Sequence, residues 1–328
     1  MEKTEIYRYT GNAGQLYGAR RVQMSEGRAT GAQIIEVRTG GGLEFDVLPD
    51  TGLDIGALRY RGVNVSYLSK NGMDTNRTFL PYENEFLHTF PGGMLYTCGL
   101  RSVGPANRDN GEWHPLHGRY HGLAATEVSV QIGEDAIIIS GVMTESALFG
   151  HVLQLRRTIT VPLMQSKIII EDTIENLTPR AEEIMLLYHF NFGYPMLSQT
   201  ARLELPDRLS VTPRDEAAHS GLGKELSFTA PIDGEPEQVF FHSLAQSRAR
   251  LVNPALQMAA SLEWGSAALP IFAQWKSMAS GDYVLGLEPS NCYIMGRQAE
   301  REHHTLQTLE GFSSMKTRLI LTLETQES

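Results

Sequence analysis

The sequence predicts an all-β fold, a large antiparallel sandwich or barrel, for a chain of 328 residues. Short runs rich in β-branched residues follow one another, and several of them alternate apolar with polar residues. Glycine, proline, asparagine and aspartate interrupt these runs at short spacing, as in antiparallel sheets. Strand-like runs do not alternate with long helical patterns, which argues against a doubly wound parallel sheet. We therefore expect one all-β domain, residues 1–328, with few helices.

The individual strands follow from these local patterns. The run 43–48 alternates strictly over its first five residues and ends at Pro49. In chain order, the expected strands cover residues 33–38, 43–48, 126–132, 136–142, 154–161, 167–174 and 317–323. Residues 243–251 suit a short helix, with the entry of a strand as the alternative. Residues 206–236 are the most polar stretch, which we interpret as a surface excursion with loops.

Composition and charge exclude several classes of protein. Hydrophobic residues make up 41% of the chain, which supports a sizeable core and rules out a disordered chain. The net charge of −10 argues against nucleic acid as a partner, because that partner needs a basic surface. Cys98 and Cys292 are the only cysteines, and the chain has neither a signal peptide nor an apolar run of about 18 residues. We expect a cytoplasmic protein without a membrane partner.

A histidine-rich loop is the first candidate for a functional site. Residues 113–122 contain His114, His117, Arg119 and His121, and the proline and glycines among them favour a loop whose side chains converge. A merely polar loop and a metal site are the alternatives. No carboxylate or cysteine lies at an obvious metal-ligand spacing, so we expect no metal here.

A second candidate lies in an otherwise apolar run. His189 and Asn191 alternate there with Tyr188, Phe190 and Phe192. In a strand, the two polar side chains point to one face and the aromatic rings to the other. If the polar face lines a cavity, an imidazole and an amide lie side by side at its wall. The alternative is a buried histidine that is bonded to a backbone carbonyl.

The third candidate is Glu288, which follows an apolar run and precedes a proline. A carboxylate is seldom buried without a partner, so this one faces a cavity, a cation or a hydrogen-bond network. A glutamate bonded to turn amides at the end of a strand is the alternative. Together with His189, His117 and Arg101, it supplies the acid, base and donor groups that a sugar-binding enzyme needs.

On these residues, the sequence resembles the aldose 1-epimerase (galactose mutarotase) superfamily, and most closely its DUF4432 branch. The resemblance runs in order from about residue 30 to the C-terminus. It is carried by residues 48–56, 60–63, 92–101, 114–119, 188–193 and 286–291. It implies a large antiparallel β-sandwich, the supersandwich of galactose mutarotase-like proteins, with a site on the concave face of one sheet.

The resemblance also implies roles for single residues. Glu288 matches the catalytic base of the family and His189 its catalytic acid. His117 and Arg101 match two residues of the family's substrate site. Arg119 and Asn191 are further substrate-binding candidates in the same motifs.

The substrate-binding aspartate of the family has no counterpart with a matching local pattern. Asp215 and Asp233 lie in the polar excursion without that pattern. Gln274 and Trp275 are candidates to take over its binding role.

The reaction that the resemblance implies is the interconversion of sugar anomers through ring opening and closing. A glutamate with a pKa of about 4.3 is ionised at pH 7 and accepts a proton. We expect Glu288 to raise the pKa of His189 enough for the imidazole to donate one. The expected ligand is a monosaccharide or a sugar derivative, and no cofactor or metal is needed.

Two other functions remain open from the sequence. A non-catalytic carbohydrate-binding protein needs the aromatic residues and Arg101, but not both His189 and Glu288. Another sugar or phosphosugar isomerase or epimerase on the same fold shares both. A metal held by His114, His117 and Glu288, or the cations Arg119 and Arg297 near the site, distinguishes those enzymes. The sequence specifies neither the sugar nor the oligomeric state.

Overall fold

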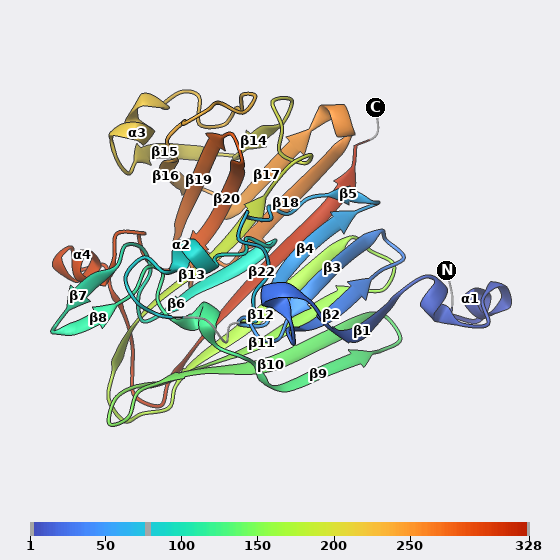
Figure 1. Ribbon diagram of the computed structural model, residues 1–328, viewed down its shortest axis with the longest axis horizontal. Coiled ribbons are helices and arrows are strands. Elements are labelled where there is room, and N and C mark those ends of the chain that lie inside the picture. The colour runs from blue at the N-terminus through green and yellow to red at the C-terminus, as the bar shows by residue number, and fades with distance from the viewer. Residues whose placement is uncertain (1–2, 76–79, 327–328) are drawn as a thin grey trace.

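A computed structural model describes residues 3–75 and 80–326 of the chain. Within these residues, two large antiparallel sheets of twelve and eight strands pack face to face, with a separate two-stranded sheet beside them (Figure 1). Helices are short and few. The prediction of an all-β antiparallel sandwich is confirmed. That the whole chain is one domain stays a prediction.

The twelve-stranded sheet has the order β1-β2-β3-β4-β6-β13-β20-β19-β16-β15, with β5 paired to β4 and β21 to β13. Its strands are β1 (Gly18–Gln23), β2 (Gln33–Arg38), β3 (Leu43–Leu48), β4 (Asp54–Tyr60), β5 (Val63–Asn64), β6 (Leu95–Leu100), β13 (Glu182–Phe192), β15 (Arg208–Pro213), β16 (Gln238–Leu244), β19 (Ile271–Ala279), β20 (Asp282–Ser290) and β21 (Gln307–Leu309).

The eight-stranded sheet has the order β14-β17-β18-β22-β12-β11-β10-β9. Its strands are β9 (Thr126–Ile132), β10 (Ala136–Ser146), β11 (Val152–Pro162), β12 (Lys167–Asn176), β14 (Arg202–Glu204), β17 (Arg248–Asn253), β18 (Met258–Trp264) and β22 (Ser314–Thr325). The small sheet pairs β7 (Asn107–Asp109) with β8 (Glu112–His114).

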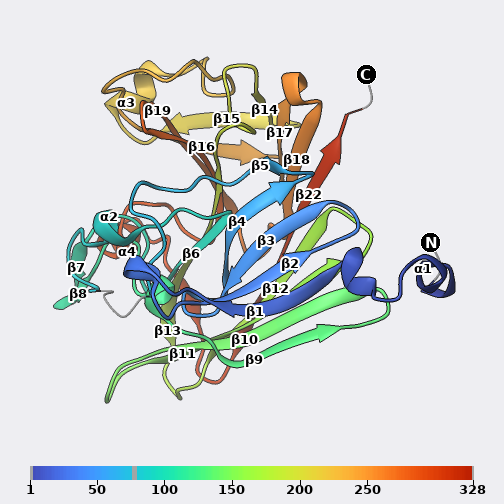
Figure 2. The same ribbon diagram turned by 45° about the vertical axis from the view of Figure 1, so that its right-hand side comes forward.

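The helices lie at the ends and outer faces of the sheets, and α1 stands apart from the sheets at the N-terminus (Figure 2). They are α1 (Lys3–Tyr9), α2 (Phe86–Thr89), α3 (Glu216–Ser220), α4 (Arg297–Glu302) and the 3₁₀ turns η1 (Ala13–Gln15), η2 (Gly27–Ala29), η3 (Tyr120–Gly122) and η4 (Pro254–Leu256). No helix in residues 3–75 and 80–326 is both long and apolar enough to cross a membrane.

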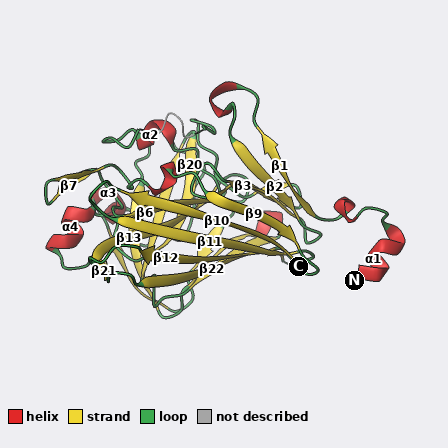
Figure 3. Ribbon diagram, turned by 90° about the horizontal axis from the view of Figure 1, so that it is seen from below, coloured by secondary structure: helices red, strands yellow, loops and turns green. Residues whose placement is uncertain are grey.

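The period-2 patterns place the core between the two sheets. In β12, Ile168, Ile170 and Ile174 point inward and are buried, while Glu171 between them is exposed. The inward faces of both sheets form the main hydrophobic cluster. A second, smaller cluster lies on the outer face of the large sheet and includes Phe86 and Phe90 of the α2 segment. Figure 3 shows α2 outside the sheets. The outer face is where the polar candidates lie.

Two local predictions need correction or refinement. The helix expected over residues 243–251 is wrong, and its alternative holds: β16 ends at Leu244 and β17 begins at Arg248. Ala249 and Leu251 are buried, and Arg250 between them is more exposed. This alternation of burial at every second residue is typical of a strand. The polar excursion 206–236 is not only loop, because it contains β15 and α3.

A buried ionic network joins the sheets. The Arg157 guanidinium of β11 contacts Asp54 Oδ1 at 2.5 Å and Asp172 Oδ2 at 2.8 Å, and all three side chains are fully buried. Arg157 Nη2 also donates to the hydroxyl of Thr97 on β6 at 2.9 Å. The Tyr188 hydroxyl on β13 donates to Asp172 at 2.7 Å. One cation thus bridges strands of both sheets.

We predict that Arg157→Ala lowers the free energy of unfolding by about 3–5 kcal/mol, because two carboxylates then stay buried without their cation. Urea denaturation measures the loss. The matched control is Arg156→Ala, since Arg156 is the exposed neighbour and pairs with Glu127 and Glu175 at the surface. That control should cost about 1 kcal/mol or less. Equal losses in the two variants would contradict the prediction.

Candidate active site

The site lies on the outer face of the large sheet, where β6, β13, β20 and β19 run side by side. Tyr96, His189, Glu288 and Trp275 come from these four strands in that order. Each strand contributes one side chain to a common patch, because side chains of neighbouring strands in register share a face.

The alternation expected in β13 is present. Tyr188, Phe190 and Phe192 point into the main core between the sheets. His189 and Asn191 therefore lie on the opposite face. The Asn191 amide is fully buried and donates to the carbonyl oxygens of Gly93 and His189, at 3.1 and 2.9 Å. Asn191 thus fixes the backbone beside His189, and its role in substrate binding stays a prediction.

A histidine and a glutamate meet at the centre of the patch. His189 Nε2 lies 3.1 Å from Glu288 Oε1. The two residues are only 6% and 1% exposed. The contact lacks hydrogen-bond geometry, and neither Glu288 Oε1 nor His189 Nδ1 has a hydrogen-bond partner within the described part of the chain. Buried polar atoms of this kind are rare unless a ligand or water bonds to them.

Gly286 lets the backbone of β20 pack closely against this pair. It is paired with Asn191 on one side and Trp275 on the other. A Cβ atom at Gly286 would lie 2.5 Å from Glu288 Oε1, 3.0 Å from Trp275 Cβ and 3.2 Å from His189 Cε1. Only glycine therefore leaves these side chains where they are.

Aromatic rings wall the pair. The Trp275 ring lies edge-on to the His189 ring at 5.3 Å between centroids, and Phe90 lies 5.9 Å away. The His117 ring is 6.2 Å from His189 and packs against Phe86 at 5.0 Å. His117, His189 and Glu288, which are far apart in the sequence, thus lie close together in the structure.

An ion pair at the rim was missed by the sequence analysis. Trp275 Nε1 donates to Glu237 Oε2 at 2.8 Å, and Glu237 Oε1 contacts Arg214 Nη2 at 3.0 Å. Arg214 also pairs with Asp215, which caps the start of α3. Arg214 and Asp215 belong to the polar excursion, and only the pairing of β16 with β19 brings Glu237 beside Trp275. No local pattern in the sequence marks this proximity.

Burial dominates the electrostatics of the pair. It raises the pKa of Glu288 to about 8, with a further increase from Glu237 and an opposing effect of Arg214. It lowers the pKa of His189 to about 3, and the neighbouring His117 adds to the decrease. Burial likewise lowers the pKa of His117 to about 4. The expected increase in the pKa of His189 is therefore wrong for the empty site. At neutral pH, the pair holds one proton, on the carboxyl group.

Other predicted site residues lie apart from the pair. Arg101 contacts Glu112 at 2.5 Å and lies 3.7 Å from Glu182, and these residues line a separate cavity of about 340 Å³. Arg119 donates to the Trp113 carbonyl at 3.1 Å. Within the described residues, neither arginine has a hydrogen bond or an ion pair with His189 or Glu288.

Gln274 lies on the other face of β19 from Trp275, because the two are adjacent in the strand. It contacts His242 Nε2 at 2.9 Å and donates to the Glu225 carbonyl at 2.7 Å. The structure therefore does not bring Gln274 to the pair.

Metal ligation has little support in the described chain. Within residues 3–75 and 80–326, no group of three or more histidine, cysteine, aspartate or glutamate side chains is arranged to hold a metal ion. His114 is buried, and neither of its ring nitrogens has a hydrogen-bond partner there. Its surroundings include Glu112 and three arginines, and burial lowers its pKa to about 4.

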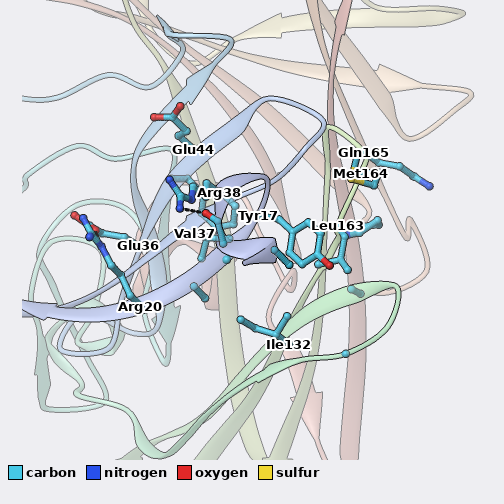
Figure 4. Close-up of a pocket in the computed structure, with 18 of the residues that line it drawn as sticks. Tyr17, Arg20, Glu36, Val37, Arg38, Glu44, Ile132, Leu163, Met164 and Gln165 are labelled. Carbon is cyan, nitrogen blue, oxygen red and sulfur yellow. Dashed lines mark hydrogen bonds and ion pairs between the residues drawn. The ribbon is translucent and has the colours of Figure 1, made fainter. Parts of the chain in front are cut away.

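A large hollow of about 1580 Å³ lies elsewhere, between the N-terminal segment, strands β1–β4 and the turns that flank β10 and end β11 (Figure 4). Its charged side chains include the exposed pair Arg20–Glu36, and Arg38 donates to the Gly14 carbonyl. Its volume exceeds the 300–1,000 Å³ or so typical of small-molecule sites. We therefore locate the active site by the chemistry of His189 and Glu288 rather than by the size of a hollow.

Solved structures share this fold. A predicted aldose 1-epimerase of Klebsiella pneumoniae superposes with a TM-score of 0.89 at 23% identity, over 96% of this chain and 87% of that one. A galactose mutarotase-like protein of Clostridium acetobutylicum superposes with a TM-score of 0.66 at 15% identity, over 95% of this chain and 100% of that one. A predicted aldose 1-epimerase of Escherichia coli superposes with a TM-score of 0.61 at 14% identity, over 90% of this chain and 100% of that one. At these identities, the likeness shows the fold alone.

None of the curated proteins matches the chain by sequence. A family model does match, over residues 29–323, and it is described as a domain of unknown function, DUF4432. That range includes every strand of both sheets except β1 and the last residues of β22. The resemblance noted in the sequence is thus confirmed, and the chain belongs to the DUF4432 family, with the fold of galactose mutarotase-like proteins.

Proposed function

We propose that this protein is an isomerase of the aldose 1-epimerase type, which interconverts the anomers of a monosaccharide. The observation that carries the proposal is the buried contact of 3.1 Å between His189 Nε2 and Glu288 Oε1, where neither Glu288 Oε1 nor His189 Nδ1 has a hydrogen-bond partner in the described residues. A protein that only binds sugar has no need of an imidazole and a carboxyl group that share one proton. An enzyme that moves two protons on one sugar ring needs both groups.

The chemistry requires one group that accepts a proton and one that donates. Glu288 takes the proton of the C1 hydroxyl while His189 gives a proton to the ring oxygen, so the bond between C1 and the ring oxygen breaks and a C1 aldehyde forms. Rotation about the C1–C2 bond presents the other face of the aldehyde. The reverse proton transfers then close the ring, and both side chains return to their starting state.

The empty site holds its proton on Glu288, so the proton has to reach His189 before this reaction. The separation of 3.1 Å between Nε2 and Oε1 is short enough for a direct transfer once a small rotation of a side chain aligns the hydrogen bond. Sugar hydroxyl groups that bond to the carboxylate and to the imidazolium offset the cost of burial that opposes the charged pair. Binding of the substrate then prepares the acid and the base together.

The rim supplies groups for the rest of the sugar. The Trp275 ring offers an apolar face for the C–H groups of a sugar, and Glu237 and Arg214 offer an acceptor and a donor for hydroxyl groups. His117 borders the same space. The cations Arg119 and Arg297, which a phosphosugar would favour, lie in the neighbourhood of Glu112 and Glu183 instead.

We predict that Glu288→Gln lowers anomer exchange at least about 10²-fold, because the amide keeps the shape but removes the basicity. Saturation-transfer NMR across a panel of aldoses, ketoses and uronates measures the exchange. Binding of the sugar should change little. Unchanged exchange in a folded Glu288→Gln protein would remove Glu288 from the mechanism.

The pH dependence follows from the shared proton. The pair loses its only proton as the pH rises through about 8, and it gains a second one as the pH falls through about 3. We therefore expect kcat/KM to be level from about pH 4 to about pH 7 and to fall above about pH 8. Side chains with ordinary pKa values would instead give a fall above about pH 6.5. Rates of anomer exchange measured as a function of pH distinguish a fall above about pH 8 from a fall above about pH 6.5.

We predict that activity survives EDTA, since side chains handle both protons. The comparison is the rate before and after dialysis against the chelator. A loss that a divalent ion restores would favour a metal-dependent isomerase, with His114, His117 and Glu288 as ligands to test.

A further inference from the structure

Large apolar side chains are exposed together at one end of the sandwich. Leu148 is 85% and Phe149 is 92% exposed in the turn between β10 and β11. Phe312, in the turn between β21 and β22, is 73% exposed, and Leu177, just after β12, is 44% exposed. We call these four residues the apolar tip surface. Single exposed apolar residues are ordinary, but a group of this size is not.

Hydrogen bonds hold the three turns side by side. The Leu177 amide donates to the Val152 carbonyl at 2.9 Å, and the Phe312 amide donates to the Thr178 carbonyl at 3.1 Å. Arg180 Nη2 donates to the Phe149 carbonyl at 3.3 Å. The turns therefore form one surface, at the lower left of Figure 1.

A close backbone approach also fixes these turns. A Cβ atom at Gly311 would lie 2.4 Å from the carbonyl oxygen of Pro179. The buried Asn176 amide donates to the carbonyl oxygens of Arg180 and Glu310, at 2.7 and 3.3 Å. The apolar side chains are thus presented on rigid turns, so little conformational entropy is lost when a partner covers them.

The size of the surface suits an interface between copies. Four such side chains expose roughly 400–500 Å², at the scale of large side chains that bury about 150–250 Å² each. Two copies that meet through this surface would bury about 1,000 Å², which is the lower bound for a specific interface. The apolar tip surface lies on exposed turns rather than in a pocket, which favours a macromolecular partner over a small molecule.

The charges at its edge favour a second copy in particular. Arg180 and Glu310 are both exposed, and neither forms an ion pair within the described residues. Their backbones lie beside Asn176, at the edge of the apolar tip surface. A two-fold axis through the surface brings Arg180 of one copy toward Glu310 of the other, twice, which makes the surface complementary to itself.

We propose that the apolar tip surface is the interface of a two-fold symmetric dimer of this chain, with Arg180 and Glu310 paired across the axis. The proposal is independent of the reaction at His189 and Glu288. The dimer leaves the outer face of the large sheet open to substrate, because the interface lies at the turns.

Sedimentation velocity from about 1 µM to about 100 µM tests the proposal, since interfaces near this size bind in the micromolar range or tighter. We expect a dimer in the full chain. Phe149→Ser should weaken dimerisation at least about tenfold. The matched control is Leu209→Ser, because Leu209 is 70% exposed on β15 of the other sheet. That control should leave the dimer intact.

Charge exchange tests the orientation of the two copies. Arg180→Glu alone and Glu310→Arg alone should each weaken the dimer, and the double variant should restore it. A monomer at every concentration, or a dimer that Phe149→Ser leaves unchanged, would overturn the proposal. The proposal would also be overturned if the chain were a monomer that co-floats with phosphatidylcholine–phosphatidylserine vesicles and lost this binding in Phe149→Ser, since the surface would then contact lipid.

Discussion

The architecture depends on one buried cation. Arg157 lies between the sheets with two carboxylates, Asp54 and Asp172, and the three charges have no access to water. Apolar contacts tolerate small shifts of one sheet over another, whereas buried charges tolerate no loss of a partner. Asp172 also accepts from the hydroxyl of Tyr188, the residue next to His189. The same network therefore joins the sheets and fixes the strand that carries His189.

Burial then decides the chemistry of the outer face. His189 and Glu288 lie under the rings of Phe90 and Trp275, so water does little to stabilise a charge on either group. The neutral acid and the neutral imidazole are the stable forms of the empty site. Glu237 and Arg214 at the rim act on the pKa of Glu288 in opposite directions and so offset each other in part.

Local patterns predicted the longer and more regular strands, because the alternation of side chains is a property of a few consecutive residues. The runs 33–38, 43–48 and 126–132 match their strands to the residue. The same alternation puts Gln274 and Trp275 on opposite faces of β19, so the expectation that both residues line the site conflicts with it.

The features that the sequence analysis missed arise from tertiary structure. Glu237 meets Trp275 only through the pairing of β16 with β19, and Asp54 meets Arg157 only when the sheets pack. The direction of the pKa shift of His189 depends on burial, which no local pattern reports.

Gly286 has a consequence for the engineering of this site. The candidate site has bare peptide at this position, since any Cβ would press on Glu288, Trp275 and His189 at once. A substitution at Gly286 cannot change the selectivity for substrates without displacing Glu288 and His189, the proposed base and acid. A mutational library for new substrates should therefore hold position 286 constant and diversify the upper edge, at Arg214, Asp215 and Glu237, where side chains reach solvent.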